Sequence, residues 1–177
     1  FQEAANLAGL DSTDWTWSIK FGDLDSDGLV DLFVTNGVGR NMNDSDRGTK
    51  YKKLMESGDK KAAQEQLLEM PPLKENNLAF KNGGDLAFEN KAQAWGVDHL
   101  GVSQGASLVD LDRDGDLDLL VSNMNEPMGI YRNEIKAASN FLVKLKGTTS
   151  NRFGLDAKVT VGVGEMELVR YLTSARG

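Results

Sequence analysis

The chain lacks cysteine altogether and has a single histidine, His99, among its 177 residues. Without cysteine it can form no disulfide bond. Any catalytic group that needs an imidazole base would have to use His99, which we expect to lie in a loop, at the surface or between repeats. The sequence also lacks a run of ~20 apolar residues, so it predicts no membrane-spanning helix. These absences favour a protein that is not an enzyme and that is stabilised without covalent cross-links.

Basic residues are few relative to acidic ones: 20 Lys and Arg stand against 27 Asp and Glu, for a formal net charge of −7. A chain of this charge, without a basic stripe, is not expected to bind nucleic acid. Nine of the acids lie in two short segments that hold one basic residue, Arg113, which leaves 18 acids and 19 bases elsewhere. The acidity is therefore local, and it indicates cation binding rather than a generally anionic surface.

The two acidic segments, residues 23–31 and 110–118, share the motif D-x-D-x-D-G-x-x-D and run into short apolar stretches. Alternate carboxylates on a turning backbone converge on one point, where a hard divalent cation such as Ca²⁺ gathers them as oxygen ligands. Gly28 and Gly115 stand at position six, where a sharp turn favours a residue without a Cβ. Two solvated acidic turns are the weaker alternative, because random Asp clusters do not repeat with this spacing.

These loops differ from EF-hands, which close with a Glu at position twelve between two helices. Here position twelve is Val34 or Val121, and the flanks are β-type apolar runs. Dockerin-type loops fail for the same reason, and thrombospondin-type calcium repeats normally bring cysteines. We therefore predict two calcium sites in β-hairpin loops, with carboxylate ligands at positions one, three, five and nine and a carbonyl ligand at position seven. The first set is Asp23, Asp25, Asp27, Asp31 and the carbonyl of Leu29; the second is Asp110, Asp112, Asp114, Asp118 and the carbonyl of Asp116.

The loops belong to a longer internal repeat. Residues 1–36 align with residues 88–123 without a gap, and 13 of the 36 positions are identical, which marks a true duplication. The match resumes at a different offset, where Ala79-Phe80-Lys81-Asn82 meets Ile130-Tyr131-Arg132-Asn133. The change of offset places an insertion of 36 residues in the first copy. The underlying unit is about 50 residues long, a length typical of propeller blades.

Each repeat is predicted as four strands, with the calcium loop between the first two and turns between the others. The insertion differs, because Lys50–Glu56 and Lys60–Met70 have helical apolar spacing and precede a Pro-Pro pair. We expect two short helices there, packed on one edge of the sheets. After residue 140 we expect a separate β module, with a strand at Phe141–Lys146 and a hairpin of Ala157–Val163 with Glu167–Tyr171.

The sequence therefore predicts an all-β fold: β-propeller-type blades, about two repeats of them, with a short helical insertion and a C-terminal β module. The predicted segments are residues 1–36 for the start of the first repeat, 37–76 for the helical insertion, 77–136 for the second repeat and 137–177 for a truncated β module. The pattern begins within a repeat and stops without a return strand, so we expect a piece of a longer protein whose leader lies upstream or was removed.

The motifs resemble those of a known family. The calcium motif, Asn82-Gly83-Gly84-Asp85-Leu86-Ala87-Phe88 and Ile130-Tyr131-Arg132-Asn133 resemble the FG-GAP/VCBS repeats of integrin-α-like β-propellers. The segment Asn-Arg-Phe-Gly-Leu-Asp-Ala-Lys-Val-Thr-Val at residues 151–161 resembles the start of the ASPIC/UnbV segment in cartilage acidic protein homologues. The insertion looks like that of bacterial secreted members. The resemblance implies an extracellular, calcium-stabilised propeller, in which two repeats would be part of a ring of about seven blades.

From these observations we expect a non-catalytic, calcium-binding fragment of a secreted or surface protein that acts in adhesion, recognition or assembly. Extracellular modules bind Ca²⁺ at about 10⁻⁴–10⁻³ M, a level available outside cells, which favours export. Its partners would be calcium, an unknown protein or glycan, and the remaining blades of the parent protein or other copies of the chain. Two alternatives are part of a secreted enzyme acting on polysaccharide, and a structural subunit that assembles through open sheet edges. Trp15 and Trp17 share one face of a strand and could stack on sugar or pack between blades.

Overall fold

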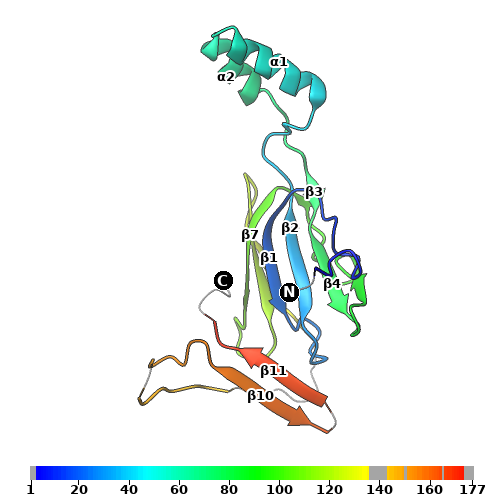
Figure 1. Cartoon of the computed structure of the whole chain (residues 1–177), viewed down its shortest axis with the longest axis vertical. Helices are drawn as coiled ribbons and strands as arrows, with labels where there is room; N and C mark the ends of the chain where they lie inside the picture. Colours follow the sequence, from blue (N-terminus) through cyan, green and yellow to red (C-terminus); the bar gives the residue numbers. More distant parts are fainter. Residues whose placement is uncertain (1–2, 136–142, 150, 165, 174–177) are drawn as a thin grey trace.

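The computed structural model describes residues 3–135, 143–149, 151–164 and 166–173. Within these ranges it contains eleven strands, paired in antiparallel sheets, and two short helices, so the predicted all-β fold with a helical insertion is confirmed. Figure 1 shows the two main sheets at the centre, the helices at one end and a β-hairpin at the other.

The first sheet is an antiparallel meander with the strand order β1-β2-β4-β5. Its strands are β1 (Thr16–Gly22), β2 (Asp31–Asn36), β4 (Leu78–Asn82) and β5 (Phe88–Asn90). Every residue of β2 is buried, because this strand is central and both of its faces are covered. Apolar and β-branched residues fill it between Asp31 and Asn36, as expected of a strand without a solvated face.

The second sheet repeats the first three strands of this arrangement as β7 (Ser103–Val109), β8 (Asp118–Asn123) and β9 (Gly129–Tyr131). The fourth strand predicted for this repeat is not found among the described residues. The repetition extends to an irregularity of register, which falls between Thr16 and Ser18 in β1 and between Ser103 and Gly105 in β7. The sequence duplication is therefore a duplication of backbone geometry. A two-stranded sheet of β3 (Glu75–Asn76) and β6 (Leu100–Gly101) joins the ends of the two repeats.

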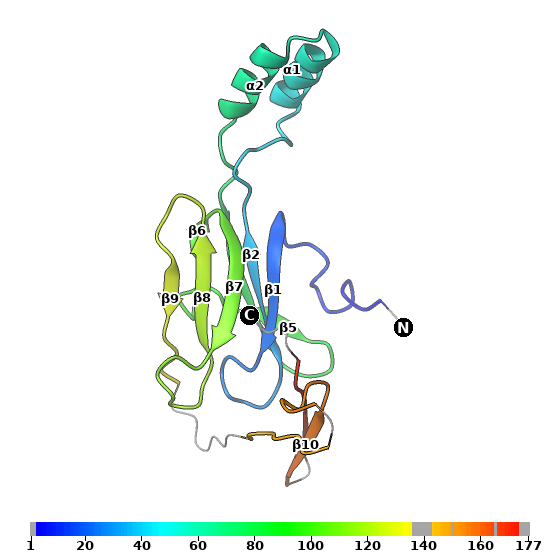
Figure 2. The ribbon, with the colours of Figure 1, turned by 90° about the vertical axis from the view of Figure 1, so that its left-hand side faces the viewer.

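The main core lies between the two sheets (Figure 2). Its fully or nearly buried members come from both repeats: Leu24, Phe33, Ala79, Ala92, Val97, Leu119 and Val121. Gly22 at the end of β1 allows a close approach there, because a Cβ at this position would lie only 2.5 Å from Cδ1 of Leu108 in β7. A smaller cluster of Leu32, Val34 and Phe80 covers the other face of the first sheet.

A buried polar network also joins the sheets. The side chain of Asn77, which is fully buried, accepts a hydrogen bond from the N–H of Asn36 at 3.1 Å and donates one to the hydroxyl of Ser103 at 3.0 Å. Ser103 in turn donates to Asn123 at 2.8 Å, and the equivalent hydroxyl of Thr16 donates to Asn36 at 2.9 Å. Polar groups that leave water in this way must keep partners to avoid a desolvation penalty.

The helices α1 (Ser45–Glu56) and α2 (Lys60–Leu68) pack against each other and project away from the sheets, as both views show (Figures 1 and 2). The prediction that they pack on a sheet edge is wrong. Two facts explain this: α1 has no buried residue, and the apolar spacing of α2 is satisfied within the insertion, where Ala63 is buried. Paired hydrogen bonds between Val38 and Leu73, each 2.9 Å long, close the base of the insertion.

The helix α1 begins five residues before the predicted start, because the side chain of Asp44 caps it by accepting from the N–H groups of Asp46 and Arg47. An N-cap carboxylate satisfies donors that the first turn leaves free. Neither described helix has the length and apolarity needed to cross a membrane.

Strands β10 (Lys158–Val163) and β11 (Met166–Tyr171) form the predicted C-terminal hairpin. The strand predicted at Phe141–Lys146 is not confirmed. Residues 141–142 lie outside the described residues, and residues 143–146 are described without strand pairing. An alternating pattern alone does not make a strand when no neighbouring strand pairs with it.

We predict that Asn77→Ala lowers the free energy of unfolding by ~1–3 kcal/mol, because it leaves the N–H of Asn36 and the hydroxyl of Ser103 with fewer partners in a buried site. Urea unfolding measures the change. Asn43→Ala, which removes an exposed amide from the helical insertion, is the control and is expected to change stability by less than ~0.5 kcal/mol. Equal losses in the two variants would show that the network does not hold the sheets together.

Candidate metal sites

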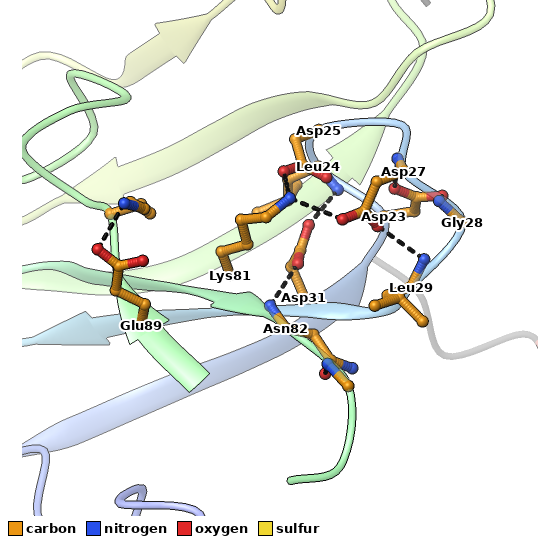
Figure 3. A network of polar contacts seen from close by, with 12 residues as sticks. Asp23, Leu24, Asp25, Asp27, Gly28, Leu29, Asp31, Lys81, Asn82 and Glu89 are labelled. Carbon is orange, nitrogen blue, oxygen red and sulfur yellow. Dashed lines mark hydrogen bonds and ion pairs between the residues drawn. The ribbon is translucent and has the colours of Figure 1, made fainter. Parts of the chain in front are cut away.

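The last Asp of each acidic motif is fully buried and holds the loop to its sheet. Asp31 accepts a hydrogen bond from the N–H of Leu24 at 2.8 Å and another from the N–H of Asn82 at 2.9 Å (Figure 3). Asp118 repeats this pattern with the N–H of Leu111 at 2.7 Å and that of Asn133 at 2.8 Å. Both oxygens of each carboxylate are thus occupied: one binds the second residue of the loop and the other binds the end of the third strand.

Two asparagines complete the attachment: Asn82 is the last residue of β4, and Asn133 follows β9. The side chain of Asn82 donates to the carbonyl of Val30 at 3.0 Å. The side chain of Asn133 lies 3.4 Å from the equivalent carbonyl, that of Leu117, and also donates to the carbonyl of Leu24 at 2.8 Å. Since Leu24 belongs to the first loop, Asn133 connects the two loops directly.

The first loop brings three carboxylates together. Oxygens of Asp23, Asp25 and Asp27 all lie within 4.8 Å of one another, a spacing compatible with one metal ion. Backbone N–H groups of the loop fix two of them: Asp23 accepts from Asp27 at 3.1 Å and from Gly28 at 3.0 Å, and Asp27 accepts from Leu29 at 2.9 Å. One oxygen of Asp25 is buried and receives no hydrogen bond from the described residues.

A lysine of the same repeat neutralises part of this cluster. The ammonium of Lys81, at the end of β4, hydrogen-bonds Asp25 and lies 2.6 Å from Oδ2 of Asp27 (Figure 3). These contacts, with Asp25 first, raise the pKa of Lys81 above its ordinary value. The lysine thus supplies one positive charge to carboxylates that a metal ion would also use.

A second basic group reaches the first loop from the C-terminal hairpin. The guanidinium of Arg170 in β11 donates to the carbonyl of Gly28 at 3.0 Å and lies 3.5 Å from Oδ2 of Asp23. Burial is the largest influence on Asp23 and raises the pKa of its carboxyl, with Arg170 opposing the rise. The first loop is therefore held by two cations of the chain itself.

The second loop gathers carboxylates without such help. Oxygens of Asp110, Asp112 and Asp118 lie within 4.8 Å of one another. Asp116 is only 4% exposed, and neither of its carboxylate oxygens receives a hydrogen bond from the described residues. Burial, followed by the neighbouring charge of Asp114, raises the pKa of Asp116 to about 6. The cluster is therefore short of positive charge.

The residue equivalent to Lys81 supplies that charge only weakly, because Glu134 is the main cause of the raised pKa of Arg132 and Asp112 and Asp114 are lesser ones. Arg132 occupies the same repeat position, but its guanidinium pairs with Glu134. Within the described residues, no ion pair connects a basic side chain to the second loop. The two loops share a backbone frame and differ in how their charge is compensated.

The structure places the predicted ligands in three roles. Those that converge are Asp23, Asp25 and Asp27 in the first loop and Asp110, Asp112 and Asp118 in the second. Asp31 lies outside the first group and uses both oxygens to hold the backbone. Asp114 lies beside Asp116, whose side chain points toward the acidic cluster although only its carbonyl was predicted as a ligand. Both clusters could hold a metal ion.

Sequence reasoning assigned no role to Lys81, Asn82, Asn133 or Arg170. The first three carried a signal, because Lys81-Asn82 aligns with Arg132-Asn133 between the repeats. Arg170 carried none, since it lies far along the chain in a different module and its contact depends on how the hairpin folds back.

Other predicted candidates show contacts that do not build a catalytic group. Nε2 of His99 lies 2.9 Å from Glu126, which also accepts from Lys74 at 2.8 Å. Lys74 is the larger cause of the lowered pKa of Glu126. The Trp15 and Trp17 rings are both exposed, with centroids 6.3 Å apart and an angle of 46° between their planes.

Comparison of the chain with models of known protein families gives no match, and comparison with curated proteins gives none. The interpretation of the two loops therefore depends on their geometry and chemistry. That geometry supports metal binding, and it differs between the loops in a way that can be measured.

We predict that Lys81→Met raises the Ca²⁺ affinity of the first loop by about tenfold, because the cation no longer competes with an ammonium for Asp25 and Asp27. Calorimetric titration in an Asp112→Asn background, which disables the second loop, measures the first loop alone. Arg132→Met is the matched control at the equivalent position and should leave this affinity unchanged. A lower affinity in Lys81→Met would contradict competition by the lysine.

We predict that Asp116→Asn stabilises the metal-free protein at pH 7 while weakening Ca²⁺ binding to the second loop. The raised pKa, about 6 against an ordinary value of 3.8, means that the ionised carboxylate costs stability above about pH 6. The expected gain is on the order of 1–2 kcal/mol. It should shrink as the pH falls toward 3.8, where the carboxyl is protonated in the folded state. Denaturant unfolding in chelator measures the gain in stability at pH 7 and its decrease at lower pH, with the exposed Asp46→Asn as control.

Proposed function

We propose that the chain is a calcium-binding, non-catalytic β scaffold of a secreted or surface protein that acts in adhesion, recognition or assembly. The observation that carries this proposal is the buried carboxylate of Asp116, which receives no hydrogen bond from the described residues beside a cluster of three further carboxylates. Such a group is costly in a folded protein unless a cation compensates it. Among the described residues, no ion pair brings such a cation to this loop.

The donor set favours calcium over other metals. Both clusters offer only carboxylate oxygens, with no imidazole or thiolate, and hard oxygen ligands suit Ca²⁺ and Mg²⁺ rather than zinc or copper. Calcium accepts six to eight oxygens in flexible arrangements, whereas Mg²⁺ demands a near-ideal octahedron and keeps its waters. A loop that offers several carboxylates and carbonyls on a turning backbone fits calcium better.

Calcium would act as a structural ion here. The loops connect β1 to β2 and β7 to β8, so they lie at the same end of the two sheets, which Figure 2 shows. The hydrogen bond from Asn133 to Leu24 already joins them, and Arg170 docks the C-terminal hairpin on the first. A cation in each loop would order the end where the two sheets and the hairpin meet.

The location of the protein follows from the affinity expected. Calcium modules outside cells bind at about 10⁻⁴–10⁻³ M, which matches extracellular but not cytosolic calcium. The first loop, whose carboxylates already bind Lys81 from β4, is expected at the weak end of this range. These arguments support export.

The non-catalytic part of the proposal is supported by the use of the acids. The clustered carboxylates, which could otherwise serve a glycosidase as acid and base, lie in the two loops, and Asp44 is engaged as a helix cap. In the described residues, the side chain of His99 contacts Glu126 and no serine or threonine hydroxyl. The exposed Trp15 and Trp17 pair favours one further candidate, glycan recognition, since paired aromatic faces can stack on sugars.

The test is calorimetric titration of chelated protein with Ca²⁺ while thermal unfolding is followed, using Asp25→Asn for the first loop and Asp112→Asn for the second. We expect two binding events, each lost in its own variant and each raising the melting temperature. Mg²⁺ should bind more weakly, and Asp46→Asn should behave as wild type. Extracellular calcium modules typically bind with dissociation constants no weaker than about 10⁻³ M. Absence of binding up to several millimolar Ca²⁺ would therefore overturn the proposal.

A further inference from the structure

One hydrogen bond runs directly from one acidic loop to the other. The side-chain amide of Asn133, which follows β9 in the second repeat, donates to the carbonyl of Leu24 at 2.8 Å. Leu24 lies between Asp23 and Asp25, two of the three clustered carboxylates of the first loop. The side chain of Asn133 therefore holds the residue that connects two candidate metal ligands.

The second loop holds the backbone of the same asparagine. The N–H of Asn133 donates to Oδ1 of Asp118 at 2.8 Å, and Asp118 is one of the three clustered carboxylates of that loop. At the other end of the connection, Leu24 is buried and its own N–H donates to Asp31 at 2.8 Å. A single residue thus joins a candidate ligand of one loop to the segment that carries two candidate ligands of the other.

The equivalent asparagine of the first repeat, Asn82, serves its own loop. Its N–H donates to Asp31 at 2.9 Å, and its side chain donates to the carbonyl of Val30 at 3.0 Å (Figure 3). Its side-chain oxygen accepts from the N–H of Gly84, two residues farther on, at 2.9 Å. None of these bonds leaves the first repeat.

Asn133 repeats each of these contacts and adds one. Its side-chain nitrogen lies 3.4 Å from the carbonyl of Leu117 in its own loop, and its side-chain oxygen accepts from the N–H of Ile135 at 3.1 Å. The bond to Leu24 has no counterpart at Asn82 among the hydrogen bonds of the described residues. The duplication therefore supplies two asparagines that differ in the connection between the loops.

We propose that Asn133 couples the two metal sites, so that Ca²⁺ in one loop raises the affinity of the other. The coupling rests on the proposed function, because it concerns the regulation of the same two sites. A cation in the second loop would fix Asp118, and through it the position of Asn133 and of the Leu24 carbonyl. The first loop would then lose less conformational freedom when it binds its own cation. Coupling of binding is reciprocal, so the first loop would favour the second by the same factor.

The charges of the two loops determine which loop fills first. The second loop buries Asp116, whose carboxylate oxygens receive no hydrogen bond from the described residues. In the first loop, Lys81 already binds Asp25 and Asp27. Calcium should therefore enter the second loop first. Asn133 would then assist binding at the first loop, where the cation has to displace the lysine.

The test measures the coupling factor by calorimetric titration with Ca²⁺. Asp112→Asn protein gives the affinity constant of the first loop alone, and Asp25→Asn protein gives that of the second loop alone. With both loops intact, the product of the two stepwise constants, divided by the product of the two single-loop constants, is the coupling factor. We expect a factor of about five or more. A merely structural loss would change the single-loop constants and leave this ratio as it is.

Matched substitutions identify the residue responsible. Asn133→Ala keeps the backbone N–H on Asp118 and should lower the factor to about one or less. Asn82→Ala removes the equivalent contacts of the first repeat and should keep the wild-type factor. Asn133→Ser should behave as Asn133→Ala, because a serine hydroxyl can still accept from the N–H of Ile135 but ends one bond short of the amide nitrogen that reaches Leu24. Any repulsion between the two cations is present in every background, so the asparagine alone distinguishes the results.

Thermal unfolding in Ca²⁺ confirms that each variant is folded before its titration is compared. A wild-type factor of about one, or a factor that Asn82→Ala lowers as much as Asn133→Ala does, overturns the coupling, while two binding events still support the proposed function. Calcium binding by one loop alone also overturns the coupling but leaves a calcium-binding protein. Binding by neither loop overturns both.

Discussion

The buried carboxylate at the end of each acidic motif is the interaction on which the rest of the structure depends. Asp31 and Asp118 each accept two backbone hydrogen bonds, one from the loop and one from an asparagine at or just beyond the end of the third strand. The carboxylate thereby closes a loop that no disulfide could close in this chain, and it aligns three strands. Because the loop is held at both ends, the carboxylates of its earlier positions have to converge, which produces the acidic clusters.

The same frame leads to two different electrostatic outcomes. In the first loop, Lys81 and Arg170 supply positive charge from the third strand and from the hairpin. In the second, Arg132 is engaged by Glu134, and an additional acid, Asp116, is buried beside the cluster. A repulsive cluster is tolerated in a folded protein only where other interactions impose it or a ligand relieves it. The backbone frame imposes the second cluster, and among the described residues no ion pair relieves its charge.

Much of the fold was readable in the sequence because local rules determine it. Short apolar runs predicted the strands that leave each loop, and the aligned repeats predicted the same order of strands and turns in both copies. The direction of α1 and α2 was not readable, because helical spacing reports that a face is buried and not which neighbour covers it. The structural role of Asp31 was missed for a related reason: its spacing in the motif suits a ligand, but its partners, the N–H groups of Leu24 and Asn82, are backbone groups that carry no sequence signal.

The acidic loops, which hold the strands together, lie apart from the exposed apolar residues of the two sheets. The acidic loops and the docked hairpin lie at one end of the sheets and the helical insertion at the other, as Figure 1 shows. The open apolar faces lie between these ends, along β1 on one side and β9 on the other, and they contain none of the clustered carboxylates. Since a cation would order only the ends of the strands, it could set the relative position of the two sheets without covering either open face. A repeat of this design can therefore be stabilised by metal while apolar residues along β1 and β9 stay exposed.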